Sequence, residues 1–131
     1  MILTAHRTVL IDAIATAGSG VLMLAARGIL YPFFGLTSPM LLDIVAVTFI
    51  AYAAAIAVVA ARPVITRAAL LTIVGVNVAS VVASVAILIA FWADLHPVGR
   101  VLIGAVALIV EAFATLQFAA ARRMPARAQL A

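Results

Sequence analysis

The chain has 131 residues, of which 69% are hydrophobic and only 9% are charged. Soluble domains are about 45–50% apolar and about 25% charged, so we expect lipid to surround most of this chain. The net charge of +4 comes from arginines at the ends of apolar segments, which form no basic stripe, so no nucleic-acid partner is expected.

Five prolines punctuate the chain, and all of them lie outside its long apolar runs. Because proline breaks helices, they divide the sequence into four apolar segments, each near the ~20 residues that a membrane-spanning helix needs. We therefore predict an all-α fold, a four-transmembrane-helix up-down bundle that forms one integral membrane domain over residues 1–131. The predicted spans are residues 9–30, 40–61, 67–92 and 98–121, followed by a basic tail at 122–131.

The first predicted span begins with a basic residue before an apolar run, as a secretory signal would. Asp12 interrupts the start of this run, and Leu24 stands where cleavage after Ala26 requires a small residue. We therefore expect a first span that is retained.

Residues 30–36, between the first two spans, are too few to cross a membrane. Their aromatic side chains suit the headgroup boundary, so we predict a short interfacial segment. Ser38 and Pro39 then predict a helix start, with serine as the N-cap and proline at the first helical position. The short link between the second and third spans predicts that these two helices are antiparallel neighbours.

The arginines are divided unequally between the two sides of the predicted bundle. Arg27 and Arg100 belong to one side. Six belong to the other: Arg7, Arg62, Arg67, Arg122, Arg123 and Arg127. Because cytoplasmic ends of spans carry the excess of positive charge, both termini are expected to be cytoplasmic.

Glu111 is the only acid in the fourth predicted span. A carboxyl group at this depth costs about 2.5–3.5 kcal/mol, and such residues usually face the bundle interior. Counted at about 1.5 Å per residue, Glu111, Asn77, Tyr52 and Ser19 all lie about 15 Å from the cytoplasmic side. We therefore predict a midplane polar cluster of Glu111, Asn77 and Tyr52, with Ser19 or Thr16 as a fourth member. No arginine shares this level, and desolvation without a cation favours the protonated acid.

Two interpretations of the predicted cluster remain open. Its polar groups can simply hold the helices together, or Glu111 can act as a proton or ligand site. Asp12 is shallower, at about 7 Å, and is expected to form an ion pair at the cytoplasmic end with Arg7, Arg67 or Arg122.

Catalysis finds no support in the sequence. There is no zinc-binding pair of histidines, no Gly-x-Ser-x-Gly elbow and no phosphate-binding loop. The chain also lacks cysteine, which excludes disulfides, thiolate metal sites and thiol nucleophiles. We expect no enzymatic activity, no catalytic residue, no metal site and no cofactor.

The run 34–42 (FGLTSPMLL), the Ala-Arg-Pro at 61–63 and the run 77–84 (NVASVVAS) resemble a family of small bacterial four-span membrane proteins without an assigned activity. Residues 111–117 and the arginine pair at 122–123 look like the last span and basic stop of that family. The resemblance covers most of the chain and implies a four-helix bundle in the inner membrane. The size is also similar to that of small multidrug transporters, but their essential glutamate lies inside the first span, where this chain has only Asp12, near the end.

The sequence therefore leaves three functions open. The first is a non-enzymatic, multi-pass protein of the bacterial inner membrane, which acts as an accessory or interaction subunit, as a homo-oligomer or within a larger complex. Its expected partners are membrane lipid and other membrane helices. The second is a small proton-linked transporter or channel with Glu111 as the titrating site. The third is a binder of a lipid or another hydrophobic ligand between the helices.

Overall fold

The computed structural model describes residues 4–124, so Arg127 and most of the predicted basic tail lie outside the described residues. Every element in this part of the chain is helical, in the order α1 (Ala5–Ala25), α2 (Arg27–Leu30), the 3-10 helix η1 (Tyr31–Phe34), α3 (Met40–Ala60), α4 (Arg67–Ala90) and α5 (Pro97–Arg122). The four long helices are each long and apolar enough to cross a membrane. The predicted four-helix membrane fold is confirmed.

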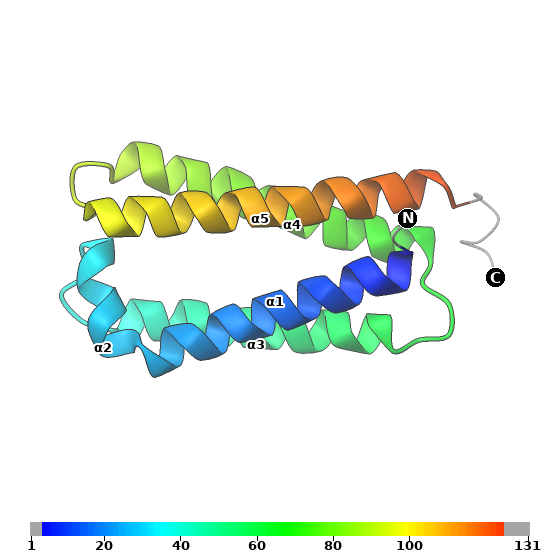
Figure 1. Cartoon of the computed structure of the whole chain (residues 1–131), viewed down its shortest axis with the longest axis horizontal. Helices are drawn as coiled ribbons and strands as arrows, with labels where there is room; N and C mark the ends of the chain where they lie inside the picture. Colours follow the sequence, from blue (N-terminus) through cyan, green and yellow to red (C-terminus); the bar gives the residue numbers. More distant parts are fainter. Residues whose placement is uncertain (1–3, 125–131) are drawn as a thin grey trace.

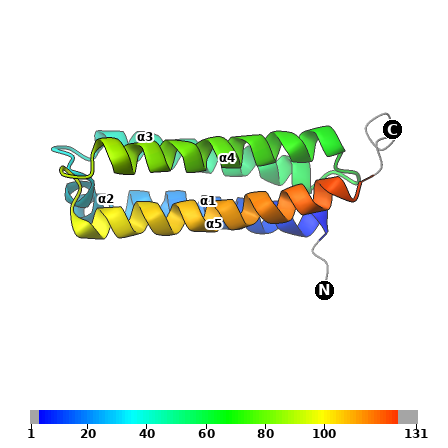
Figure 2. The same ribbon diagram turned by 90° about the horizontal axis from the view of Figure 1, so that it is seen from above.

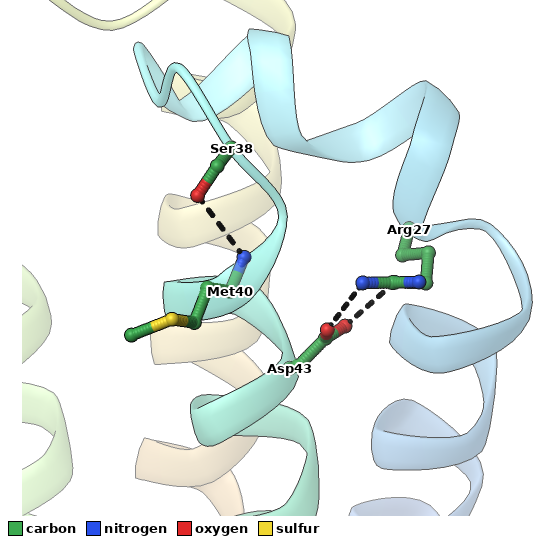
Figure 3. A network of polar contacts seen from close by, with 4 residues as sticks. All are labelled: Arg27, Ser38, Met40 and Asp43. Atoms are coloured by element: carbon green, nitrogen blue, oxygen red, sulfur yellow. Dashed lines mark hydrogen bonds and ion pairs between the residues drawn. The ribbon is translucent and has the colours of Figure 1, made fainter.

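Side chains at the helix starts explain where the helices begin. The Thr4 hydroxyl accepts a hydrogen bond from the Arg7 N–H at 3.3 Å, so α1 begins earlier than predicted. The Thr66 hydroxyl accepts from the Ala69 N–H at 3.1 Å at the start of α4. The structure begins α3 at Met40, one residue later than Ser38 as N-cap would place it, although the Ser38 hydroxyl still accepts from the Met40 N–H at 3.4 Å (Figure 3).

The long helices form two closely packed pairs, α1 with α3 and α4 with α5 (Figures 1 and 2). The short link at 61–66 therefore joins one pair to the other, and α3 and α4 are not the closest neighbours that the link predicted. Within the first pair, Gly20 lets the backbones approach closely. A Cβ added there would lie 2.7 Å from the Ile50 side chain and 2.8 Å from the Ala46 carbonyl oxygen.

A cluster of buried apolar side chains lies toward one end of the bundle, where α1 and α4 begin and α3 and α5 end. We call this the Arg122 end, and the opposite end the Trp92 end. All four long helices contribute to the cluster, which consists of Val9, Ala13, Ile56, Ile65, Leu70, Ile73 and Ala121. Five of the described arginines belong to this end, in agreement with the side that the sequence assigned to them.

At the Trp92 end, the predicted interfacial segment packs against the start of α5 (Figure 1). The His96 N–H donates to the Phe33 carbonyl at 3.1 Å, and the two aromatic rings lie 4.9 Å apart. A Cβ on Gly99 would overlap the Phe33 carbonyl oxygen, so only glycine permits this contact. Arg27 forms a bidentate ion pair with Asp43, with distances of 2.9 and 2.6 Å (Figure 3). This segment thus joins the two helix pairs.

The outer surface of the bundle is apolar. Only 11% to 28% of the residues in the most apolar window of each long helix are buried inside the protein. Large aliphatic side chains such as Ile14, Ile89 and Leu108 are exposed, and together they form an apolar surface larger than those of soluble monomers. Together with the four apolar helices, this surface makes the chain a multi-pass membrane protein.

Candidate functional site

Three buried polar side chains from three helices bond to one another inside the bundle. Asp12 of α1, Asn77 of α4 and Gln117 of α5 are 2%, 3% and 0% exposed. The Asp12 Oδ2 accepts from the Asn77 Nδ2 at 2.9 Å and from the Gln117 Nε2 at 2.7 Å. The Asn77 Nδ2 also donates to the Gln117 Oε1 at 2.8 Å. Every pair in this triangle is therefore linked by a hydrogen bond.

Two further side chains extend the triangle. The Thr16 hydroxyl donates to the Asp12 Oδ1 at 3.2 Å, one helical turn along α1. The Tyr52 hydroxyl, from α3, donates to the Asn77 Oδ1 at a long distance of 3.4 Å. All four long helices thus contribute to one network. We call Asp12, Thr16, Tyr52, Asn77 and Gln117 the polar cluster.

The donors and acceptors of the polar cluster match one another. Both N–H groups of the Asn77 amide are used, and the Gln117 amide uses its oxygen and its nitrogen. Asp12 accepts three hydrogen bonds and donates none, which is the pattern of an ionised carboxylate. Its partners are neutral amides and a hydroxyl, so hydrogen bonds replace the water and the cation that a charge would otherwise require.

The predicted ion pair of Asp12 with an arginine is wrong. Within residues 4–124, the salt bridge that forms is Arg27–Asp43, and Asp12 takes part in none. Arg7 is five residues from Asp12, which places the two side chains about 140° apart around α1. Arg122 is exposed at the end of α5, and the Arg67 Nε is buried without a hydrogen-bond partner among the described residues.

The predicted place of Glu111 inside the bundle is also wrong, because this side chain is exposed on the outer surface of α5. The buried side of α5 is formed by Ala107, Ala114, Gln117 and Ala121. Glu111 precedes Gln117 by six residues, which rotates it by about 120° around the helix. Gln117, which is six residues nearer the Arg122 end, therefore takes the place in the polar cluster that was predicted for the acid.

The other predicted members have different positions. Asn77 and Tyr52 belong to the polar cluster, and so does Thr16, which was one of two alternatives for the fourth member. Ser19 does not, because its hydroxyl donates to the Ala15 carbonyl of its own helix at 2.8 Å. This back-bonding satisfies the serine locally, so it needs no partner from another helix.

Gln117 was missed in the sequence and Asp12 was assigned to an ion pair, although the sequence contained a signal for each. Ala107, Ala114 and Ala121 repeat every seven residues, which marks the packed side of α5, and Gln117 lies on that stripe. Asp12 and Gln117 each lie five residues from an arginine near a helix end, so both are at about 7 Å depth. Asn77 was counted at about 15 Å, so a count of residues from the helix ends did not place these three side chains at one level.

The centre of the polar cluster is buried, whereas Thr16 and Tyr52 at its edge are half-buried. A cavity of about 300 Å³ opens at the Arg122 end, lined by residues such as His6, Ile65 and Met124, and no member of the polar cluster lines it. Across residues 4–124, no group of three or more histidine, aspartate or glutamate side chains is arranged to hold a metal ion. The geometry therefore provides interhelical hydrogen bonding among all four long helices.

Comparison with known protein families, with curated proteins and with solved structures finds no match in any of the three. A function for this chain must therefore be inferred from its own residues.

Proposed function

We propose that this chain is a non-enzymatic, four-helix integral membrane protein of the bacterial inner membrane, which acts as an accessory or interaction subunit or as a homo-oligomer. The observation that carries the proposal is the buried triangle at the centre of the polar cluster, in which Asp12, Asn77 and Gln117 bond to one another. Such a network fixes how the four helices sit against each other and leaves their outer faces free for other helices.

The energetics suit a structural role for the polar cluster. Interhelical hydrogen bonds in membranes are worth about 0.6 kcal/mol on average, with about 1.7 kcal/mol at the upper end. The three bonds of the Asp12–Asn77–Gln117 triangle therefore contribute on the order of 2–5 kcal/mol. Within hydrocarbon no water competes for these groups, so rotating one helix would leave them unpaired. This favours one arrangement of the bundle over the alternatives.

The orientation follows from the arginines. Arg7, Arg62, Arg67, Arg122 and Arg123 lie at the Arg122 end, and only Arg27 and Arg100 lie toward the other. The positive-inside rule supports a cytoplasmic Arg122 end. The basic side chains there can also contact anionic headgroups.

The other two functions have less support. A proton-linked transporter needs its titrating acid in a cavity that water reaches from one side, whereas Glu111 lies on the outer surface of the bundle. A ligand between the helices needs space, and the polar cluster fills its position with its own side chains. Asp12 replaces Glu111 as the acid that any transport hypothesis must use.

Labelling with a hydrophobic carbodiimide, which reacts with protonated carboxyl groups in membranes, tests the proposal directly. The full chain is reconstituted in liposomes as the Glu111→Gln variant and is labelled between pH 5 and pH 8. Because this variant lacks the Glu111 carboxyl group, labelling in the middle of the spans reports on Asp12. A structural, ionised Asp12 should stay unlabelled throughout. The same liposomes should hold an imposed pH gradient as long as empty ones do. Labelling of Asp12 that follows pH, together with proton leakage that Asp12→Asn abolishes, would favour the transporter.

A further inference from the structure

Glu111 is the one acid of the described chain that projects from the middle of a membrane-spanning helix toward lipid. It lies eleven residues before Arg122 and fourteen after Pro97, hence about 16 and 21 Å from the two ends of α5. Its side chain is exposed, and within residues 4–124 its carboxyl group has no hydrogen bond or ion pair. Charged and polar groups are rare at this depth and almost always meet a partner.

The surroundings of Glu111 suit a second helix. Gly104, Leu108, Glu111 and Thr115 are spaced by four, three and four residues, so they form one stripe along α5. A Cβ on Gly104 would meet nothing within 4 Å, and Leu108 is 74% exposed, so the stripe is open. The Thr115 hydroxyl donates to the Glu111 carbonyl of its own helix at 2.9 Å, which leaves its oxygen free to accept. We call these four residues the Glu111 stripe.

We propose that the Glu111 stripe is the contact surface of a homodimer, in which the Glu111 carboxyl groups of two copies bond to each other near a two-fold axis along the membrane normal. The occupant follows from complementarity. A protonated carboxyl group has one donor and one acceptor, so it is its own best partner, and two-fold symmetry brings both copies to the same depth. The arginines of residues 4–124 lie near helix ends, so this part of the chain offers no cation at that level. Gly104 allows the two α5 helices to approach closely.

This inference rests on the proposed function as an interaction subunit or homo-oligomer, and cross-linking of the full chain in liposomes tests it. The chain contains no cysteine, so single cysteines can be placed at will. Leu108→Cys and Thr115→Cys lie one turn on either side of Glu111. Ala51→Cys is the matched control, because it is exposed at similar depth on α3, which lies diagonally across the bundle from α5 (Figures 1 and 2). Under oxidation, the two α5 variants should give a dimer and the α3 variant should not.

Replacing the acid completes the test. Adding Glu111→Leu to each α5 cysteine variant should lower the cross-linked fraction at least about five-fold at equal protein density, since each of the two hydrogen bonds of the carboxyl pair changes such an equilibrium about three-fold or more. Adding Glu111→Gln should preserve the dimer, because amides also pair reciprocally. Equal cross-linking at Ala51→Cys, or no effect of Glu111→Leu, would overturn the proposal. So would energy transfer between labelled copies that falls to the random-collision level in dilute liposomes. If the protein is a monomer and the carbodiimide leaves Asp12 unlabelled, only the dimer is refuted. If the protein is a dimer and the carbodiimide labels Asp12, only the structural role of the polar cluster is refuted.

Discussion

Replacing Gln117 by leucine should destabilise the protein more than any other change of similar size in α5. Gln117 is completely buried, donates to Asp12 at 2.7 Å and accepts from Asn77 at 2.8 Å. Leucine keeps most of the volume but removes both bonds, and it leaves the Asp12 carboxylate with one fewer donor in an apolar environment. Two interhelical hydrogen bonds at about 0.6–1.7 kcal/mol each, plus the extra cost for a charged acceptor, give a loss of about 2–4 kcal/mol.

The assay is reversible unfolding in mixed micelles, in which helicity is followed as the denaturing detergent is increased. Thr48→Val, on α3, is the control, because Thr48 is exposed, bonds only to its own helix and lies outside both the polar cluster and the Glu111 stripe. The control should change the free energy of unfolding by less than about 0.5 kcal/mol. If Gln117→Leu is as stable as the control, the polar cluster does not hold the bundle together and the reasoning fails.

Three other predictions concern Asp12 in the polar cluster, the close contact of α1 with α3 at Gly20, and the ion pair at the Trp92 end. Asp12→Asn keeps the shape of the side chain and two of its acceptor bonds while it removes a buried charge. It should therefore cost less than about 1 kcal/mol in the same unfolding assay. A loss as large as that of Gln117→Leu would contradict the interpretation that neutral hydrogen-bond donors alone stabilise Asp12. Gly20→Leu should lower the free energy of unfolding by about 1–3 kcal/mol or more, because even a Cβ would come within 2.7 Å of a neighbouring side chain. Gly18→Ala is the control and should be tolerated, because a Cβ at Gly18 meets nothing within 4 Å. A double-mutant cycle on Arg27 and Asp43 should give a coupling below about 1 kcal/mol that shrinks as salt is added, because both side chains are partly exposed; a larger, salt-independent coupling would show that the pair is shielded by lipid.

The amino-acid sequence by itself determined the number of spans, their approximate limits and the unequal distribution of arginine. These properties depend on local composition and length: about 20 apolar residues between prolines can only be a helix in lipid. The sequence also placed Asn77 and Tyr52 at a common depth, because depth is a simple count along a helix. The predicted limits were off by a few residues at most ends, since caps such as Thr4 act through single hydrogen bonds.

Only the tertiary structure decided which acid lies inside. The rotation of a helix is visible in a sequence when one face is apolar and the other polar, but these spans are apolar nearly all round. The rotation of α5 depends on its packing against α4, with Ala107, Ala114 and Ala121 on the buried side. That packing turns Gln117 toward Asp12 and turns Glu111 toward lipid. A difference of six residues is about 9 Å along the helix axis and a rotation of about 120° around it, and this rotation separates an interior group from a surface group.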